Sequence, residues 1–383
     1  MNIEGLKFGV IGGGIGGVAA ALALRQRGAQ VTVFEQAAEL TEVGAGLQIS
    51  ENGMVVLRAL NVVGETHEAG IRSYGTLLRD YRAGRSISEI PAPAAGPTYY
   101  YHRADLLGLL HKQALREGVE FRLGARVSRV HKHPSEAEVV LGDGTRLRVG
   151  CAIAADGGRS EIRVGLNGPE APEFTHQVAW RATIPWARRD QKPCAVLTMG
   201  PGRHVVTYPL RDHTLMNIVA IEERSDWKEE GWRLRGEPED LRARFFDFGG
   251  LVGEILGQVQ EPHIWALFLR PVAEHWQNGR VALLGDAAHP TLPFMAQGAC
   301  LALEDAWVLA RSFDEQSGVT QALAAYETRR RPRAKRVVDA AGANARNFHL
   351  RGPMRLAAQM ALLAIGPRLS RKYEWIYAYD ATV

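Results

Sequence analysis

The stretch "VIGGGIGG" (residues 10–17) decides the fold, because Gly12, Gly14 and Gly17 form a GxGxxG pattern. It continues an apolar run at 7–11 that we interpret as a strand, and it opens an alanine-rich helix. Such glycines allow a tight turn and let a pyrophosphate approach the helix N-terminus, whose free N–H groups attract anions. The stretch therefore predicts a dinucleotide-binding turn.

A second strand follows at 30–34 and ends in Glu35. A carboxylate at this position can accept hydrogen bonds from a ribose, so the acid favours a cofactor with a free ribose hydroxyl, which is NAD or FAD rather than NADP. The strand, helix and second strand together form a βαβ unit. The alternative interpretation is a glycine-rich turn that only serves packing.

The composition is that of an ordinary soluble protein of two or three domains, with 46% hydrophobic and 23% charged residues among 383. A net charge of +4 suits an anionic cofactor but is too weak to indicate nucleic acid. Cys151, Cys194 and Cys300 form no CxxC pair, so we expect no structural metal and a reducing, cytoplasmic location. Glycines interrupt the first apolar run, so no signal peptide is expected.

Two further segments distinguish NAD from FAD. "ADGGRSEIR" (155–163) places Asp156 at a strand end within a DGxxSxxR pattern, and "LLGDAAHPTLPFMAQGACLALEDA" (283–306) places Asp286 at another. With GxGxxG, these patterns resemble the three ordered fingerprints of the single-component FAD-dependent aromatic hydroxylases, which have the para-hydroxybenzoate hydroxylase fold. The resemblance covers nearly the whole chain. It is strongest to the branch of salicylate hydroxylase, 3-hydroxybenzoate 6-hydroxylase and 6-hydroxynicotinate 3-monooxygenase.

The resemblance implies an α/β fold: a Rossmann-like FAD-binding domain with an inserted β-sheet substrate domain and a C-terminal helical tail. The chain fits this organisation, because residues 179–269 are rich in Trp, Thr, Val and Tyr and alternate as antiparallel strands do. We therefore expect a discontinuous FAD-binding domain at 1–72, 98–178 and 270–340. A β-rich substrate domain is expected at 73–97 and 179–269, and a C-terminal helical segment at 341–383.

The resemblance also implies which residues hold FAD. Asp286 would accept hydrogen bonds from the ribityl–pyrophosphate region, since a buried carboxylate needs such partners, although it could instead cap the following turn. Gly298 and Ala299 would offer backbone N–H groups from a helix N-terminus to the reduced flavin, which is anionic there. The full expected set is Gly12, Gly14, Gly16, Gly17, Glu35, Gln36, Gln48, Arg103, Val127, Asp156, Asp286, Pro293, Gly298 and Ala299.

The sequence departs from parts of the family pattern. Gln48 and Phe294 stand where the hydroxynicotinate enzyme pattern has histidine, which argues against a pyridine substrate. Cys300 stands where many relatives have asparagine, and we interpret it as a small packing residue.

The implied reaction is hydroxylation of a phenolic aromatic acid that is similar to salicylate or hydroxybenzoate. NADH or NADPH reduces FAD, and O2 then forms a flavin hydroperoxide that transfers one oxygen atom to the ring. No second GxGxxG is present, so NAD(P)H is expected to bind transiently. Two alternatives stay open: an oxidase or epoxidase of a non-phenolic biosynthetic substrate, and a ligand-responsive flavoprotein without turnover.

The expected catalytic residues are His204 and Tyr208 in "RHVVTYPL" (203–210). On a strand they share one face, with α-carbons about 13 Å apart, so they would approach one ring from two sides. His204 would be the base that draws the proton from the phenol, and His289 is an alternative base. The expected substrate contacts are Arg181, His204, Tyr208 and Phe294; Arg181, Arg203 or Arg211 would bind a carboxylate.

The C-terminal part is expected to be helical. The apolar run at 356–365 is too short to span a bilayer, and we interpret it as a buried helix, with peripheral membrane contact as an alternative. The basic cluster "RRRPRAKR" (329–336) is interpreted as a solvated helix face. We expect no nucleic-acid partner and a monomer or homodimer.

Overall fold

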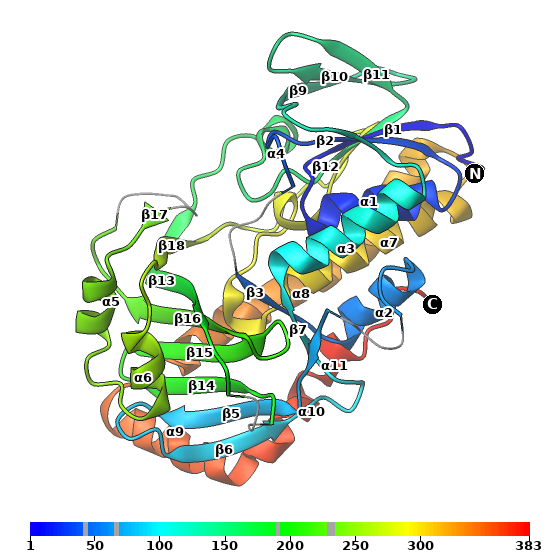
Figure 1. The fold of residues 1–383 in the computed structure, drawn as a ribbon. Coiled ribbons are helices and arrows are strands. Elements are labelled where there is room, and N and C mark those ends of the chain that lie inside the picture. The colour runs from blue at the N-terminus through cyan, green and yellow to red at the C-terminus, as the bar shows by residue number, and fades with distance from the viewer. Residues whose placement is uncertain (41–44, 65–68, 189–191, 228–233) are drawn as a thin grey trace.

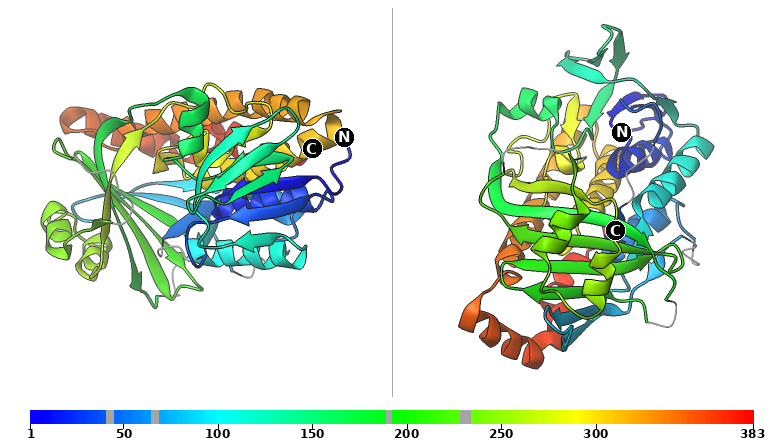
Figure 2. Two further views of the ribbon diagram at one scale, coloured as in Figure 1. Left: turned by 90° about the horizontal axis from the view of Figure 1, so that it is seen from above. Right: turned by 60° about the vertical axis from the view of Figure 1, so that its left-hand side comes forward.

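The computed structural model describes residues 1–383 except 41–44, 65–68, 189–191 and 228–233. The chain forms two lobes, each built on a large sheet, and helices of the C-terminal part run beneath both (Figure 1). Figure 2 shows the same two lobes from above and from the side, with the larger sheet standing beside the helices of the other lobe.

The first lobe is built on a five-stranded parallel sheet in the order β19-β12-β1-β2-β8. Its strands come from three separate parts of the chain. The first part supplies β1 (Lys7–Ile11) and β2 (Gln30–Phe34), the second β8 (Glu120–Arg122) and β12 (Cys151–Ala154), and the third β19 (Val281–Leu283). Because the carboxyl ends of parallel strands meet at one edge, the turns after β1, β2, β12 and β19 lie close together.

Helices cover one face of this sheet and a small antiparallel sheet covers the other (Figure 1). The helices are α1 (Ile15–Arg25), α3 (Arg103–Arg116) and α7 (Gly298–Glu315). The small sheet consists of β9 (Val127–Lys132), β10 (Ala137–Leu141) and β11 (Arg146–Val149), and α4 (Glu161–Asn167) follows β12.

Close packing of α1 explains two of its glycines. A Cβ on Gly17 would lie 2.0 Å from the carbonyl oxygen of Gly12, so only glycine permits the tight turn after β1. A Cβ on Gly16 would lie 2.9 Å from Leu284 and 3.0 Å from Ala302. Gly16 therefore lets α1 approach α7 closely.

The second lobe is built on an eight-stranded sheet in the order β17-β18-β13-β16-β15-β14-β5-β6, in which only the β14–β5 pair is parallel. The strands are β5 (Gly75–Asp80), β6 (Ser86–Pro91), β13 (Glu173–Pro185), β14 (Ala195–Gly200), β15 (Arg203–Leu210), β16 (Leu215–Glu223), β17 (Leu234–Arg235) and β18 (His263–Leu269). Helices α5 (Pro238–Arg244) and α6 (Leu251–Gly257) pack on one face through an apolar cluster. The opposite face is left to the site described below.

The two lobes are joined by short elements and by the C-terminal helices. A three-stranded sheet in the order β3-β7-β4 stands between the lobes, and α8 runs along both. These elements are β3 (Gly46–Ile49), α2 (Glu51–Ala59), β4 (Ile71–Arg72), β7 (Tyr99–His102), η1 (Gly285–Ala287), η2 (Pro293–Met295), α8 (Val319–Asn347), α9 (Gly352–Ile365), η3 (Gly366–Arg368), α10 (Leu369–Lys372) and α11 (Glu374–Tyr377). The predicted fold class, an α/β protein with an additional β-sheet lobe and a helical C-terminal region, is confirmed.

The prediction that residues 356–365 form a buried helix is wrong. The helix forms as α9, but Leu356, Met360 and Leu363 are 61–70% exposed. The reason is that α9 lies against the outer strand β6, where only one side of the helix, including Leu362, meets the apolar cluster of that sheet. Across the described ranges, every helix is too short or too polar to cross a bilayer.

The prediction of a solvated basic face at 329–336 is also wrong in part. Arg330 is fully buried and lies 2.7 Å from Asp305 and 2.6 Å from Glu304, which are both on α7. Arg333 binds Glu304 at 2.7 Å. Helix α8 packs across α7, and its arginines are buried there because they neutralise two buried carboxylates.

Candidate active site

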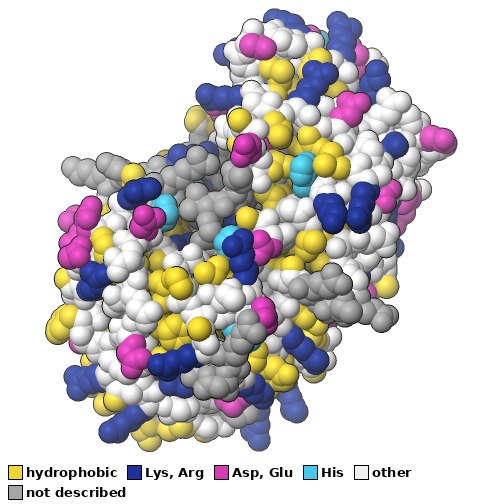
Figure 3. Space-filling view, viewed as in Figure 1, with side chains coloured by type: hydrophobic (Ala, Val, Ile, Leu, Met, Phe, Trp, Pro, Cys, Tyr) yellow, Lys and Arg dark blue, Asp and Glu magenta, His cyan; other side chains and the backbone are white. Residues whose placement is uncertain are grey.

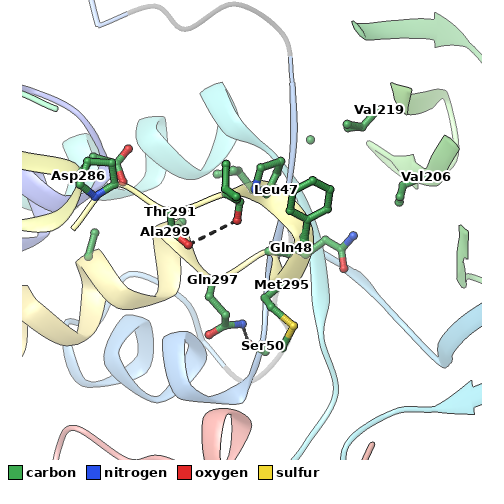
Figure 4. Close-up of a pocket in the computed structure, with 18 of the residues that line it drawn as sticks. Leu47, Gln48, Ser50, Val206, Val219, Asp286, Thr291, Met295, Gln297 and Ala299 are labelled. Carbon is green, nitrogen blue, oxygen red and sulfur yellow. Dashed lines mark hydrogen bonds between the residues drawn. The ribbon is translucent and has the colours of Figure 1, made fainter. Parts of the chain in front are cut away.

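A cavity of about 1240 Å³ lies between the two lobes. Its walls come from the turns at the carboxyl edge of the parallel sheet, from the free face of the eight-stranded sheet, from residues 290–299 and from the C-terminal helices. In Figure 4, Asp286 lies at one end, while Val206 and Val219 of the large sheet face Gln48 and Met295 at the other. The cavity therefore joins a dinucleotide-type end to a sheet-lined end.

The residues expected to hold FAD are brought together at this cavity, although the chain separates them widely. Gly17 is the exception, because it packs beneath the turn. Those that line the cavity are Gly12, Gly14, Gly16, Glu35, Gln36, Gln48, Arg103, Val127, Asp156, Asp286, Pro293, Gly298 and Ala299.

Glu35 is held rigidly where β2 ends. One carboxylate oxygen accepts the N–H of Gly13 at 2.7 Å, and the other accepts the N–H of Ala37 at 2.8 Å. Each carboxylate oxygen has a second lone pair. Glu35 can therefore accept hydrogen bonds from ribose hydroxyls without losing its backbone contacts.

The DGxxSxxR segment ties its strand to the loop after β19. Ser160 caps α4 by accepting the N–H of Arg163 at 3.0 Å. The buried Arg163 guanidinium donates to Glu170 at 2.6 Å and to the carbonyl of Ala288 at 3.0 Å. Within the described residues Oδ1 of Asp156 is buried with no hydrogen-bond partner, and burial raises the pKa of this carboxyl to about 6. Asp156 is thus an acceptor that a bound hydroxyl or N–H group would satisfy.

Asp286 lies within η1 and faces the cavity. It is exposed to the cavity but lies deep in the protein, so burial raises the pKa of its carboxyl, while His289 and Arg103 lower it. The N-terminus of α7 also faces the cavity. Gln297 precedes this helix and does not cap it, because its side chain is bound to Ser50 at 3.0 Å instead.

These features fit FAD. The glycine turn, the carboxylate at Glu35, the unpartnered Asp156 oxygen and the uncapped helix beginning at Gly298 supply what a dinucleotide with a flavin ring requires: anion-binding N–H groups and hydroxyl acceptors. The residues that would hold its flavin ring are those of the α7 N-terminus and the loop before it.

The sheet-lined end has an apolar floor with one charge at its edge. Strand pairing places five side chains in one row across five strands, which are Leu78, Leu197, Val206, Val219 and Arg181. All five line the cavity. A flat apolar ring that carries an anionic group matches this row chemically.

Arg181 is a candidate anchor for that anionic group. Its guanidinium lies 4.8 Å above the Trp265 ring, and its buried Nε has no hydrogen-bond partner within the described ranges. Burial lowers its pKa to about 10, so it stays charged at neutral pH. The two other expected anchors do not line the cavity, because Arg203 pairs with Asp247 at 2.9 Å and Arg211 pairs with Asp105 at 2.7 Å.

His204 lies on the cavity face of β15, in the row next to Arg181. Its Nδ1 shares a hydrogen bond of 2.8 Å with Nε2 of His349, which leaves Nε2 of His204 to meet a ligand. The ring centroids of Phe294 and Phe348 lie 5.8 and 5.3 Å from its own. Burial, followed by the neighbouring His349, holds the pKa of His204 well below its ordinary value. His204 is therefore an uncharged proton acceptor at neutral pH.

Tyr208 lies on the same face of β15 and also lines the cavity. Its ring packs 4.8 Å from that of Tyr100, and burial raises the pKa of its phenol above the usual value. The row containing Val206 separates Tyr208 from His204 on this face.

His289, the alternative base, does not line the cavity. It is fully buried, and its Nε2 lies 2.5 Å from Asp305, which also binds Arg330. Its position ties the loop after β19 to α7 and α8. Cys300 is likewise buried and packs near Ser50, at 3.7 Å between Sγ and Oγ.

The sequence interpretation missed several residues at the site. His349 contacts His204, Phe348 and Leu362 close the cavity from the C-terminal part, and Tyr100 packs on Tyr208. No motif marks these residues, since each is placed by tertiary packing. "YYYH" at 99–102 is an aromatic strand next to Arg103, and it is the one local signal that could have indicated Tyr100.

Comparison with known proteins identifies the family. A family model described as an FAD binding domain matches residues 6–341, which is most of the chain. The chain belongs to this FAD-binding family. The family predicted from the three fingerprints is thereby confirmed.

Relatives of this FAD-binding protein align along nearly its whole length. The 3-amino-4-hydroxybenzoate 2-monooxygenase PtnB3 of Streptomyces platensis is 32% identical and covers 98% of this chain and 96% of its own. The 3-hydroxybenzoate 6-hydroxylase of Klebsiella oxytoca is 32% identical, with 97% and 96% covered. Klebsiella pneumoniae HpxO, solved with FAD and uric acid, is similar with a TM-score of 0.85 at 26% identity, covering 96% of each chain.

Proposed function

We propose that this protein is an FAD-dependent monooxygenase that hydroxylates a phenolic aromatic acid with NADH or NADPH and O2. One arrangement carries the proposal: His204 and Arg181 lie in neighbouring rows over an apolar floor, in a cavity that continues to the dinucleotide end. Relatives that are named for hydroxylating hydroxybenzoates support it. A bound FAD, held by the glycine turn, Asp286 and the N-terminus of α7, would supply the redox chemistry by which NAD(P)H and O2 provide one oxygen atom for the ring.

The protein binds and orients the ring. Arg181 binds the carboxylate of the substrate, and Val206 and Val219 contact the ring face. A charged hydrogen bond of this kind contributes about 1.5–3 kcal/mol, which is enough to select acids over neutral phenols. Tyr208 contacts the ring from the second side.

The protein also moves a proton. Nε2 of His204 accepts the proton of the substrate hydroxyl, so that the ring becomes more electron-rich. Because the pKa of His204 is depressed, the base form is present at neutral pH. Phe294 and Phe348 exclude water around the imidazole.

Free, buried thiols at Cys151, Cys194 and Cys300 support a reducing location, and we propose the cytoplasm. Charged side chains of both signs are interspersed on the face in Figure 3, which suits a small-molecule enzyme. A monomer or homodimer is proposed. The domain boundaries at 72, 97, 178 and 269 stay proposals from the sequence, and position 178 lies within β13 of the eight-stranded sheet.

The proposal is tested first by FAD binding and then by analysis of the reaction products. Purified protein should be yellow and release FAD on denaturation. A panel of hydroxybenzoates should then be screened for faster NADH and NADPH oxidation, with O2 uptake and ring products measured together. Stimulated NADH loss that yields only hydrogen peroxide would contradict the proposal.

A non-phenolic substrate is the second candidate. One observation favours it: HpxO, with 26% identity, was solved with uric acid, which is not a phenol. Including purines and other nitrogen heterocycles in the same screen separates the two candidates. Product formation from a heterocycle but from no phenol would select the second.

A further inference from the structure

His204 and His349 stand between two hollows of the protein. His204 lines the large cavity, while His349 lines a second cleft whose other walls are Thr175, His176, Gln177, Glu223, Arg224 and Ser225. The two imidazoles share a hydrogen bond of 2.8 Å and have ring centroids 4.9 Å apart. The pair is therefore a polar connection between the two hollows.

His349 meets two polar groups on its outer side. Its Nδ1 lies 3.4 Å from a carboxylate oxygen of Glu223 and 3.2 Å from the side-chain nitrogen of Gln177. The Glu223 side chain is 37% exposed and also pairs with Arg351. Its exposure places the outer end of this connection in contact with solvent.

The backbone fixes His349 in this position. It is the second residue after the end of α8, and its carbonyl accepts the N–H of Gly202, which precedes β15, at 3.3 Å. Only 4% of His349 is exposed, so little water reaches its ring except through the second cleft. A histidine on a chain terminus or loose loop would lack such constraints.

The contacts of the two imidazoles allow two proton arrangements. In the first, the proton on Nδ1 of His349 faces Glu223 at 3.4 Å, and Nδ1 of His204 donates to Nε2 of His349, so that Nε2 of His204 carries a free lone pair toward the cavity. In the second, Gln177 donates to Nδ1 of His349, Nε2 of His349 donates to His204, and Nε2 of His204 holds a proton. Glu223 supports the first arrangement and Gln177 the second.

We propose that His204, His349 and Glu223 form a proton exit that carries the hydroxyl proton of the substrate from the large cavity to the second cleft. The inference rests on the proposed function. The substrate O–H breaks as Nε2 of His204 gains the proton, His204 passes its Nδ1 proton to Nε2 of His349, and His349 passes its Nδ1 proton to Glu223 and then to water. No electrons are exchanged, and the substrate is left as its phenolate.

The surroundings of the two imidazoles favour transfer of a proton through them over retention of a proton on either ring. Both imidazoles are buried, and burial lowers the pKa of each, so neither holds an extra proton stably. The charged groups that face His349 are Glu223, which favours its cation, and Arg351, which opposes it. The contacts of the histidine pair offer the proton a route from the cavity to the second cleft.

The test follows a proton without turnover. The probe is 3-hydroxy-4-nitrobenzoate, whose phenolate absorbs visible light, bound to the oxidised FAD-loaded protein. A stopped-flow pH jump then measures how fast the bound probe ionises. The variants are His349→Gln, which keeps a polar side chain that does not relay protons, and Glu223→Gln. The matched control is His176→Asn, which lines the same cleft outside the proposed path.

We expect both relay variants to bind the probe as before and to slow its ionisation by about 100-fold, which is the low end of what a positioned acid or base contributes. The His176→Asn rate should equal that of the unaltered protein. Unchanged rates in both relay variants with bound probe would overturn the exit. Normal ionisation in His204→Gln, or no probe binding to the unaltered protein, would instead count against the proposed function on which the exit depends.

Discussion

Arg181 and His204 project from the same face of the eight-stranded sheet, one row apart and with a single strand between them. Arg181 pairs with Val219 and His204 pairs with Ile221, two residues further along β16. Their α-carbons are therefore about 12 Å apart from strand geometry. Two long side chains over that span can hold opposite ends of one benzene ring, so the sheet register itself sets the distance between carboxylate and hydroxyl.

Replacing Arg181 should weaken the binding of acids selectively. Arg181→Met should raise the KM for a carboxylated phenol by about 10- to 100-fold, as expected for a lost charged hydrogen bond, with a smaller effect on kcat. Arg203→Met removes an arginine of β15 that pairs with Asp247 outside the cavity, and it should leave KM unchanged. Equal effects of the two substitutions would show that Arg181 is no anchor.

The pH dependence should reflect the depressed pKa of His204. The base form is active, so kcat/KM should stay level as the pH falls through 6.5, the ordinary histidine value, and should decline only in more acidic solution. The titratable group in contact with His204 is His349, whose pKa is also lowered, to about 4. A pH profile recorded where circular dichroism shows intact protein tests this, and an acid limb centred near 6.5 would be inconsistent with it.

Two glycines of the first turn should separate cofactor binding from folding. A Cβ on Gly14 meets no atom within 4 Å and points into open cavity, so Gly14→Ala should fold normally but bind FAD at least about tenfold more weakly, or about 1.4 kcal/mol. A Cβ on Gly17 overlaps the Gly12 carbonyl, so Gly17→Ala should lose about 3 kcal/mol of unfolding free energy. FAD titration and thermal melting of the apoprotein measure the two effects. A destabilised Gly14→Ala apoprotein would contradict this assignment.

The buried arginine on α8 should matter for stability. Arg330→Met removes the fully buried cation that binds both Asp305 and Glu304, while Glu304 keeps its pair with Arg333, and the free energy of unfolding should fall by about 3–5 kcal/mol. Lys335→Met breaks an exposed pair with Asp339 on the same helix and should cost less than about 1 kcal/mol. Denaturant unfolding of the two variants, followed by tryptophan fluorescence, measures both losses of unfolding free energy. Similar losses for the two variants would refute the role given to Arg330.

The sequence correctly predicted those features of the cavity that depend on residues close together in the chain. The turn at Gly12, the acid at Glu35 and the strand ends at Asp156 and Asp286 each depend on neighbouring residues, and all four lie together at the cavity. The alternation of "RHVVTYPL" correctly placed His204 and Tyr208 on one face.

Other features depend on which distant surfaces meet. Arg330 is buried because α8 crosses the acidic residues of α7, and the spacing of "RRRPRAKR" contains no sign of that partner. Leu356 is exposed because α9 packs at the outer strand of a sheet. His349 reaches His204 across 145 positions of chain, and no motif records such a contact.

The most direct test of the central claim is the fate of labelled oxygen. The FAD-loaded protein is supplied with NADH or NADPH, a phenolic acid that stimulates its oxidation, and ¹⁸O2, and the ring product is analysed by mass spectrometry. The account predicts one ¹⁸O atom in the product ring for each nicotinamide oxidised, and loss of that product in His204→Gln with FAD retained. Label found only in hydrogen peroxide or water, with every phenolic acid unchanged, would contradict it.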